Sequence, residues 1–164
     1  MTLSATAAIV FLIAALPIGV FVSFSDLARL KIPNVAVGAL LAWFVITGPF
    51  LFDSFEQYLW QLSHFIMLLL LGMVMNAAGV MGAGDAKFIA AAGPMVAIGD
   101  LRLIIVIYAA SILGGFATHR AAKYSPLRKA VPHWKSWDSG KRFPMGFPLS
   151  MTLIGYLAII IAVG

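Results

Sequence analysis

The sequence predicts an all-α membrane protein with about six transmembrane helices. Of its 164 residues, 62% are hydrophobic and only 10% are charged, and the mean hydropathy is +1.01. A soluble domain of this length has too small a core to hide so much apolar surface, so lipid must be the solvent for most of the chain. A transmembrane helix needs about 20 mostly apolar residues. The candidate spans are 4–24, 33–52, 59–78, 86–98, 101–117 and 147–163.

The residues at the start of the first two spans indicate how these spans begin. No Lys or Arg precedes the first span, which therefore lacks the basic region of a cleavable signal peptide, and we expect it to be retained. The second span opens at Pro33, where a missing N–H is harmless because the first helical turn leaves such groups unpaired.

The fourth span, 86–98, is the shortest and gives only about 20 Å of helix. We expect its N-terminal end to begin below the membrane surface, which would place Asp85 in a recess. With no room left for a large soluble domain, residues 1–164 are predicted to form one membrane-embedded domain.

Charges in the connecting segments predict the orientation. Arg29 and Lys31 follow the first span and Lys87 follows the third, whereas Asp53 and Glu56 follow the second. Seven cations precede the last span: Arg120, Lys123, Arg128, Lys129, Lys135, Lys141 and Arg142. By the positive-inside rule the protein is a multi-pass protein of the inner (cytoplasmic) membrane, with both termini outside and these basic segments in the cytoplasm.

The loop 119–145 mixes its cations with Tyr124, Trp134 and Trp137. Aromatic and basic residues together are typical of a segment that lies on lipid headgroups. The net charge of +5 comes mostly from this loop, so we interpret it as attraction to anionic headgroups and expect no nucleic-acid partner. The chain has no cysteine, which excludes disulfides, thiolate metal sites and a Cys nucleophile, and the three histidines show no metal-ligand spacing. We expect no metal and no cofactor.

Asp85 stands in an otherwise uncharged glycine-rich cluster, Met81-Gly82-Ala83-Gly84-Asp85-Ala86-Lys87. Glycine has no Cβ, so a peptide backbone or a second helix can approach closely there. At a helix start, backbone N–H groups and the helix dipole favour the ionised carboxylate. A simpler interpretation is that Asp85 only caps the helix after a glycine-rich turn.

Asp26 ends the first apolar stretch, and its simplest role is an ion pair with Arg29 on the same helix end. The two aspartates together predict more, because both belong to the same predicted membrane face. Two carboxyls that are too close for both to ionise share one proton, and such a pair can act as acid and base at once. Asp26 and Asp85 are therefore the candidate catalytic residues.

These motifs resemble those of the type IV prepilin peptidases, membrane aspartic peptidases with a Gly-x-Gly-Asp signature. Gly82, Gly84 and Asp85 match the signature, with Lys87 following as is common in the family, and Asp26 precedes Ile32-Pro33-Asn34 as the other family Asp precedes its Ile-Pro-Asn. The segment Pro144-Met145-Gly146-Phe147-Pro148 is similar to the family's Pro-Tyr-Gly-Pro stretch, with Met145 in place of the aromatic residue.

The resemblance implies the membrane fold of Gly-x-Gly-Asp aspartic peptidases and cleavage of a short basic leader from a pilin-like precursor. The cut lies at the cytoplasmic face, after a Gly that precedes a hydrophobic helix. Larger members carry a Cys-containing segment and also methylate the new N-terminus. This chain has no Cys and starts directly in a span, so we expect no methyltransferase segment and the greatest similarity to the short peptidases of tight-adherence (Flp) pili.

Three alternatives stay open at the level of sequence. The chain could be a relative of the archaeal preflagellin peptidases, which share these motifs. It could be an ion or proton transporter that uses both carboxylates, although predicted span ends are an unusual place for a transport site. It could also be a non-catalytic scaffold in which both aspartates are helix caps.

Overall fold

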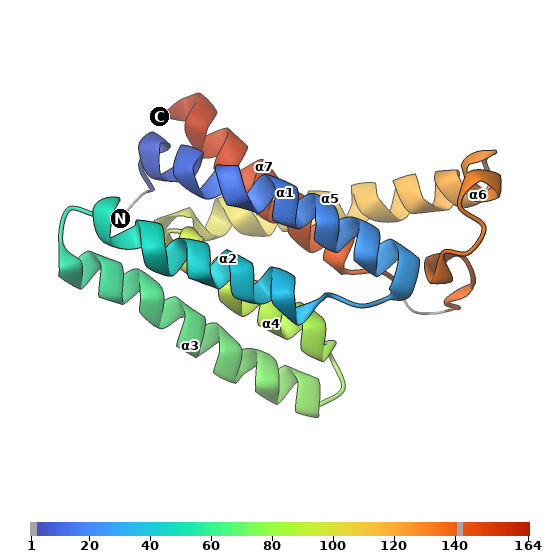
Figure 1. Ribbon diagram of the computed structural model, residues 1–164, viewed down its shortest axis with the longest axis horizontal. Coiled ribbons are helices and arrows are strands. Elements are labelled where there is room, and N and C mark those ends of the chain that lie inside the picture. The colour runs from blue at the N-terminus through green and yellow to red at the C-terminus, as the bar shows by residue number, and fades with distance from the viewer. Residues whose placement is uncertain (1–2, 141–142) are drawn as a thin grey trace.

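The computed structural model describes residues 3–140 and 143–164, which are helical apart from short connections (Figure 1). The α-helices are α1 (Ala5–Arg29), α2 (Asn34–Thr47), α3 (Phe55–Ala77), α4 (Ala83–Ala92), α5 (Leu101–Lys123), α6 (Leu127–Ala130) and α7 (Gly146–Val163). Short 3₁₀ helices are η1 (Gly48–Phe50), η2 (Gly93–Met95), η3 (Ile98–Asp100) and η4 (Lys135–Asp138). The all-helical class predicted from the sequence is confirmed.

Four of the described helices are long and apolar enough to cross a membrane: α1, α3, α5 together with η3, and α7. The chain is therefore a polytopic membrane protein. The sequence predicted about six spans, but the other two candidates are shorter: α2 with η1 covers Asn34–Phe50, and α4 has only 10 residues. The helices α1, α2, α3, α4, α5 and α7 nevertheless run alternately in opposite directions, and both termini lie at the same end of the molecule (Figure 1).

Two helix boundaries differ from the predicted spans. Helix α1 continues past residue 24 to Arg29, so Asp26 lies inside its last turns. Helix α5 continues past residue 117 to Lys123 and so projects beyond its apolar part. The extension of α1 carries Asp26, which is buried, and the extension of α5 carries His119, which stacks on Trp137.

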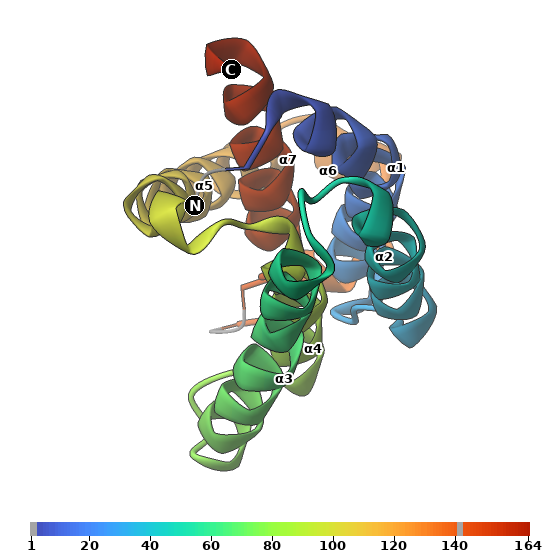
Figure 2. The ribbon, with the colours of Figure 1, turned by 90° about the vertical axis from the view of Figure 1, so that its left-hand side faces the viewer.

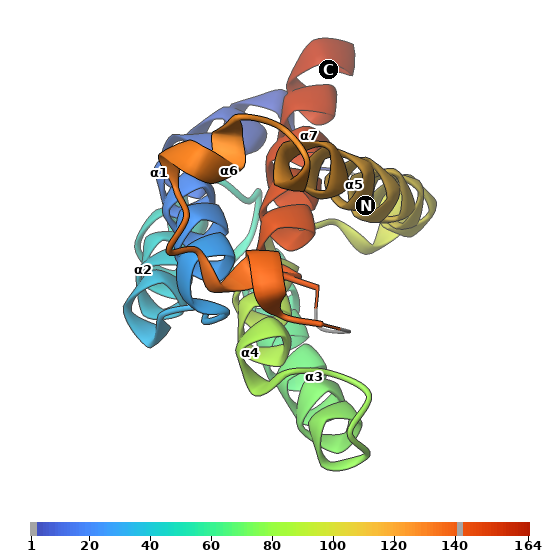
Figure 3. The same cartoon turned by 90° about the vertical axis from the view of Figure 1, so that its right-hand side faces the viewer.

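Helix α7 lies at the centre, with α1 and α2 on one side of it and α5 on another, whereas α3 and α4 form a pair that projects away (Figures 2 and 3). Small residues allow the closest contacts. A Cβ on Gly19 would lie 2.9 Å from Cδ1 of Ile154, where α1 packs on α7. A Cβ on Gly72 would lie 2.7 Å from Cβ of Ala86, where α3 packs on α4. Small residues at helix crossings are how membrane helices approach closely without a hydrophobic driving force between them.

Helix α4 ends at Ala92, before the predicted end of the fourth span at residue 98, because Gly93 and Pro94 follow it. The irregular backbone beyond this end is held by two side chains. Gln61 Nε2 donates to the carbonyl of Val96 (3.4 Å), and the hydroxyl of Tyr156 accepts from the N–H of Ala97 (3.2 Å). Irregular backbone at membrane depth is tolerated where protein groups satisfy it, which is the case here.

The described residues of the segment 119–145 fold into a small cap, in which η4 packs against α1. The indole of Trp137 is only 1% exposed and stacks on His119 and Trp134, with centroid distances of 5.0 and 5.6 Å. Its Nε1 donates to the carbonyl of Val131 (2.8 Å). The prediction that the aromatic residues of this loop lie on headgroups is wrong for Trp137, because stacking and this hydrogen bond bury the ring.

The cations of the cap divide into two groups. Lys123 donates to the carbonyl of Trp137, and Arg128 forms a 3.1 Å salt bridge with Asp138. Arg120, Lys129 and Lys135 are exposed. Lys141 and Arg142 lie outside the described residues.

Candidate active site

Asp26 is buried at the end of α1, where only 5% of the residue is exposed. The backbone N–H of Gly146, the first residue of α7, donates a 2.6 Å hydrogen bond to its Oδ2. The helix ends three residues later, at Arg29, because Leu30 adopts a left-handed conformation (φ 55°), and the N–H of Leu30 donates to the carbonyl of Asp26 (2.8 Å). Two hydrogen bonds therefore hold Asp26 in place, one to its backbone carbonyl and one to its carboxylate.

Asp85 lies in the first turn of α4, whose N-cap is Gly82. Asp85 is therefore not the N-cap residue itself, although its carboxylate accepts a hydrogen bond from the backbone N–H of Gly82 and so helps to cap the start of the helix. Burial and the nearby charge of Asp26 raise the pKa of Asp85 to about 6, against a hydrogen bond from the backbone of Gly82 that lowers it. A carboxyl with this pKa is half protonated at about pH 6, so it can either donate or accept a proton there.

Asp26 and Asp85 line one cavity of about 620 Å³ at the same end of the molecule. The structure therefore brings together the two residues that the sequence analysis paired. The cavity is also lined by residues of the connection between α1 and α2, of the glycine-rich turn before α4, and of the segment just before α7. Polar and apolar groups both line it, and its volume is large enough to admit water molecules beside the carboxylates.

Glycines border both carboxylates. A Cβ on Gly146 would lie 2.9 Å from Cβ and 3.0 Å from Oδ2 of Asp26. A Cβ on Gly82 would lie 2.7 Å from Oδ2 of Asp85. Real Cβ atoms essentially never come this close, so each position accepts only glycine without a shift of the carboxylate.

Gly84 has a different neighbour. A Cβ there would lie 3.3 Å from Cβ of Ile32, so the space beside this glycine is filled by Ile32, the first residue of the Ile32-Pro33-Asn34 motif. Pro33 is the N-cap of α2, and Asn34 begins the helix. The two motifs that flank the aspartates therefore pack directly on each other.

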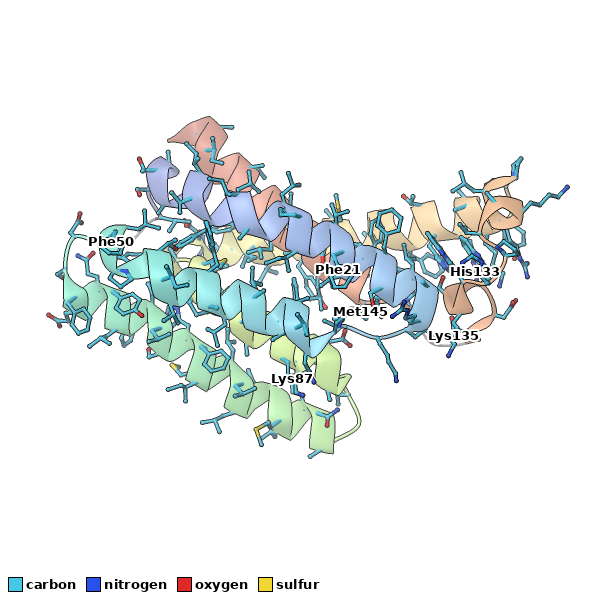
Figure 4. The ribbon with its side chains drawn as sticks, viewed as in Figure 1. Phe21, Phe50, Lys87, His133, Lys135 and Met145 are labelled. Atoms are coloured by element: carbon cyan, nitrogen blue, oxygen red, sulfur yellow. The ribbon has the colours of Figure 1, made fainter. Side chains whose placement is uncertain are left out.

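Lys87 joins the same two motifs by a second contact. Its Nζ donates to Oδ1 of Asn34 (3.3 Å), which links α4 to the start of α2 at the exposed rim of the cavity. Figure 4 shows Lys87 on α4 and Met145 just before α7, and both line the cavity.

Sequence reasoning missed several wall residues, namely Lys31, Met81, Phe143 and Met145. Gly146 was selected only because it belongs to a motif, with no indication that it contacts Asp26. The pattern that could have indicated a tight contact is a glycine set between Pro144 and Pro148 directly before an apolar helix. Pro144 itself is buried beside it.

The arrangement of these groups can support hydrolysis. Two carboxyls in a water-accessible cavity, one of them with a pKa near 6, can hold one proton between them and exchange it with a substrate and a water molecule.

Comparison with known proteins gives one match. The model of the type IV leader peptidase family matches residues 10–118, a region that contains Asp26 and Asp85 and ends before Gly146. Neither the curated proteins nor the solved structures contain a match to the chain. With about two thirds of its length and both cavity aspartates inside the family match, the chain belongs to the type IV leader peptidase family and is a prepilin leader peptidase, an aspartic endopeptidase.

Proposed function

We propose that Asp26 and Asp85 are the catalytic pair of this peptidase and that they share one proton. The observation that carries the proposal is that both line one cavity, close enough for the charge of Asp26 to raise the pKa of Asp85. Gly82, Gly84, Lys87, Pro33, Asn34, Pro144 and Gly146 act as supporting residues that position the pair.

The reaction uses the pair as base and acid. The ionised carboxylate takes a proton from water while the water oxygen attacks the carbonyl carbon of the scissile peptide bond. The protonated carboxyl gives its proton to the carbonyl oxygen, which forms a tetrahedral intermediate. When this intermediate collapses, the C–N bond breaks and the leaving amine receives a proton from the pair.

The proposed orientation places this cavity at the cytoplasmic face and both termini outside. Arg29, Lys31 and Lys87 lie at the cavity end of the molecule, whereas both termini lie at the opposite end (Figure 1). The positive-inside rule supports this orientation. In it, α2 and the α4 segment complete a six-crossing path, and the exposed cations Arg120, Lys129 and Lys135 lie where anionic headgroups attract them.

The proposed substrate is a Flp-like prepilin, on the basis of the resemblance to the short members of the family. Cleavage of a preflagellin precursor in preference to a Flp-like prepilin would replace this assignment with the archaeal-type alternative. Incubation of the enzyme with each precursor, followed by mass spectrometry of the products, distinguishes the two.

Single substitutions test the catalytic pair. Membranes that contain Asp26→Asn or Asp85→Asn protein are expected to cleave the precursor about 10²–10⁴-fold more slowly than wild type, because general acid–base catalysis contributes on that order. The matched control is Asp53→Asn, since Asp53 is exposed in the connection between α2 and α3 and does not line the cavity. Wild-type cleavage by either cavity variant, when it is inserted at a wild-type level, would overturn the proposal. Undiminished activity in a chelator is also expected, and its loss would indicate a metal.

A further inference from the structure

A second cavity of about 430 Å³ lies beside the catalytic cavity, between the α3–α4 pair and α5, with α7 behind it. Figures 2 and 3 show α5 standing apart from α3 and α4 on this side of the molecule. The lining is almost wholly apolar, and the volume falls in the range of roughly 300–1,000 Å³ that is typical of ligand sites.

The α4 wall of this cavity continues the face that carries Asp85. Phe88, Ile89 and Ala92 line the cavity, at positions three, four and seven residues after Asp85. Residues at this spacing lie on one face of an α-helix. A chain that extends along this face therefore passes from the carboxylate of Asp85 directly onto an apolar surface.

The α5 wall has the same periodicity. Leu101, Ile104, Ile105 and Tyr108 line the cavity and form a single stripe. Helix α5 is poorly covered by the described protein, with only 6% of its most apolar stretch buried. Its stripe is thus an unpartnered surface that faces α4 across the cavity.

The two cavities meet at Met81, which lines both. On one side of Met81 lie two carboxylates and two lysines, and on the other side lies the apolar cavity. A peptide that is polar before its scissile bond and apolar after it fits this change of surface.

From this geometry we propose that the apolar cavity is the binding site for the hydrophobic helix that follows the scissile bond of the precursor. The leader then lies in the polar cavity, and Met81 marks the boundary at which cleavage occurs. This inference rests on the proposed function, because it needs Asp26 and Asp85 to be the catalytic pair.

His64 favours a peptide over a lipid chain as the occupant. It lines the cavity and is only 9% exposed, and its Nε2 has no hydrogen-bond partner within residues 3–140 and 143–164. A buried nitrogen without a hydrogen-bond partner destabilises the protein, so a partner from the bound molecule would be favourable. A helix with a polar side chain can supply the missing partner, whereas an acyl chain cannot.

Cysteine cross-linking tests the location directly, since the chain has no cysteine of its own. Ile105 and Val106 are both exposed on α5 (57% and 65%), but only Ile105 lines the cavity. Ile105→Cys and Val106→Cys are each combined with Asp85→Asn, which keeps the precursor uncut, and with a precursor that carries one cysteine in its hydrophobic helix. We expect oxidation to cross-link the Ile105→Cys protein at least about tenfold more than the Val106→Cys protein. Equal yields, or no cross-link at either position, overturn the proposal and assign the cavity to lipid.

Kinetics separate this inference from the proposed function. Ile105→Trp narrows the cavity and is expected to raise KM for the full precursor about tenfold, with kcat and the thermal unfolding temperature unchanged. Val106→Trp is the matched control and is expected to behave as wild type. An unchanged KM in Ile105→Trp, with active wild type, overturns the helix site and leaves the catalytic pair standing. Normal cleavage by Asp26→Asn or Asp85→Asn protein would overturn the proposed catalytic pair. The cross-link would still show where the precursor binds.

Discussion

The N–H of Gly146 donates a 2.6 Å hydrogen bond to the carboxylate of Asp26, a residue 120 positions earlier in the chain. The bond joins the last turns of α1 to the first residue of α7. It also brings Gly146 so near that a Cβ there would lie 3.1 Å from Cγ of Asp26. The position of Asp26 therefore depends on α7 as much as on its own helix.

Gly146→Ala is expected to lower kcat/KM for the precursor about 100-fold, because misplacement of a catalytic group by about 1 Å has an effect of that order. The new methyl group would clash with Cβ of Asp26, so either the carboxylate or the start of α7 must shift. Cleavage assays at several precursor concentrations measure the change. Gly155→Ala on the same helix is the control, since its Cβ would make an ordinary 3.4 Å contact with Ile107. Equal activity of both variants would contradict the role assigned to Gly146.

The pH dependence of cleavage is expected to reflect Asp85. Its pKa is raised to about 6, so the pair loses its shared proton as the pH rises through that value. Because one carboxyl must be protonated, kcat/KM is expected to fall about tenfold per pH unit above about pH 6. Initial rates between about pH 5 and pH 8 give the profile, and recovery of activity on return to the lower pH shows that the enzyme stayed folded. A flat profile over this range contradicts a shared proton.

Stability should depend on pH in the same region. Asp85 binds its proton more tightly in the folded protein than in the unfolded chain, where the pKa is near 3.8. The stability that Asp85 contributes is therefore fully present below about pH 4 and is lost as the pH rises to about 6. Asp85→Asn removes this loss. The unfolding temperature of the variant, relative to that of wild type, is therefore expected to be higher at about pH 7 than at about pH 4. Thermal unfolding in detergent measures this difference, and a constant offset at both pH values argues against the raised pKa.

Tyr156→Phe is expected to destabilise the protein by about 1–3 kcal/mol, because it leaves polar groups of the irregular segment after α4 without a partner. The lost hydroxyl accepts from Ala97 N–H (3.2 Å) and donates to Oδ2 of Asp100 (2.7 Å). Thermal unfolding measures the change in stability. Tyr124→Phe is the control because Tyr124 is 78% exposed. A similar loss of stability in both variants would contradict the stabilising role assigned to the hydroxyl of Tyr156.

Hydrophobicity and charge were sufficient to predict the class of fold and the pairing of the two aspartates. Apolar runs identify membrane helices whatever their neighbours, and alternating loop charges placed Asp26 and Asp85 on one face before any contact was known. Helix ends were harder to predict. Asp26 lies inside α1, and its carboxylate accepts from the N–H of Gly146, a contact that no local pattern around Asp26 could indicate.

The end of α4 could have been predicted from the sequence, because the Gly93-Pro94 pair is a strong signal for a helix end. The burial of Trp137 could not be predicted from the sequence, because it depends on stacking against His119 and Trp134, which belong to different parts of the cap. An aromatic residue in a basic loop has the same sequence pattern whether it lies on lipid or folds inward.

Helix α7 contacts both halves of the catalytic apparatus, Asp26 through Gly146 and the far end of the Asp85 segment through Tyr156, about 15 Å further along the same helix. Helix α7 thus connects Asp26 to the far end of the segment that carries Asp85. A tilt of α7 in a bilayer of different thickness is therefore expected to carry both parts of the site with it rather than to separate them.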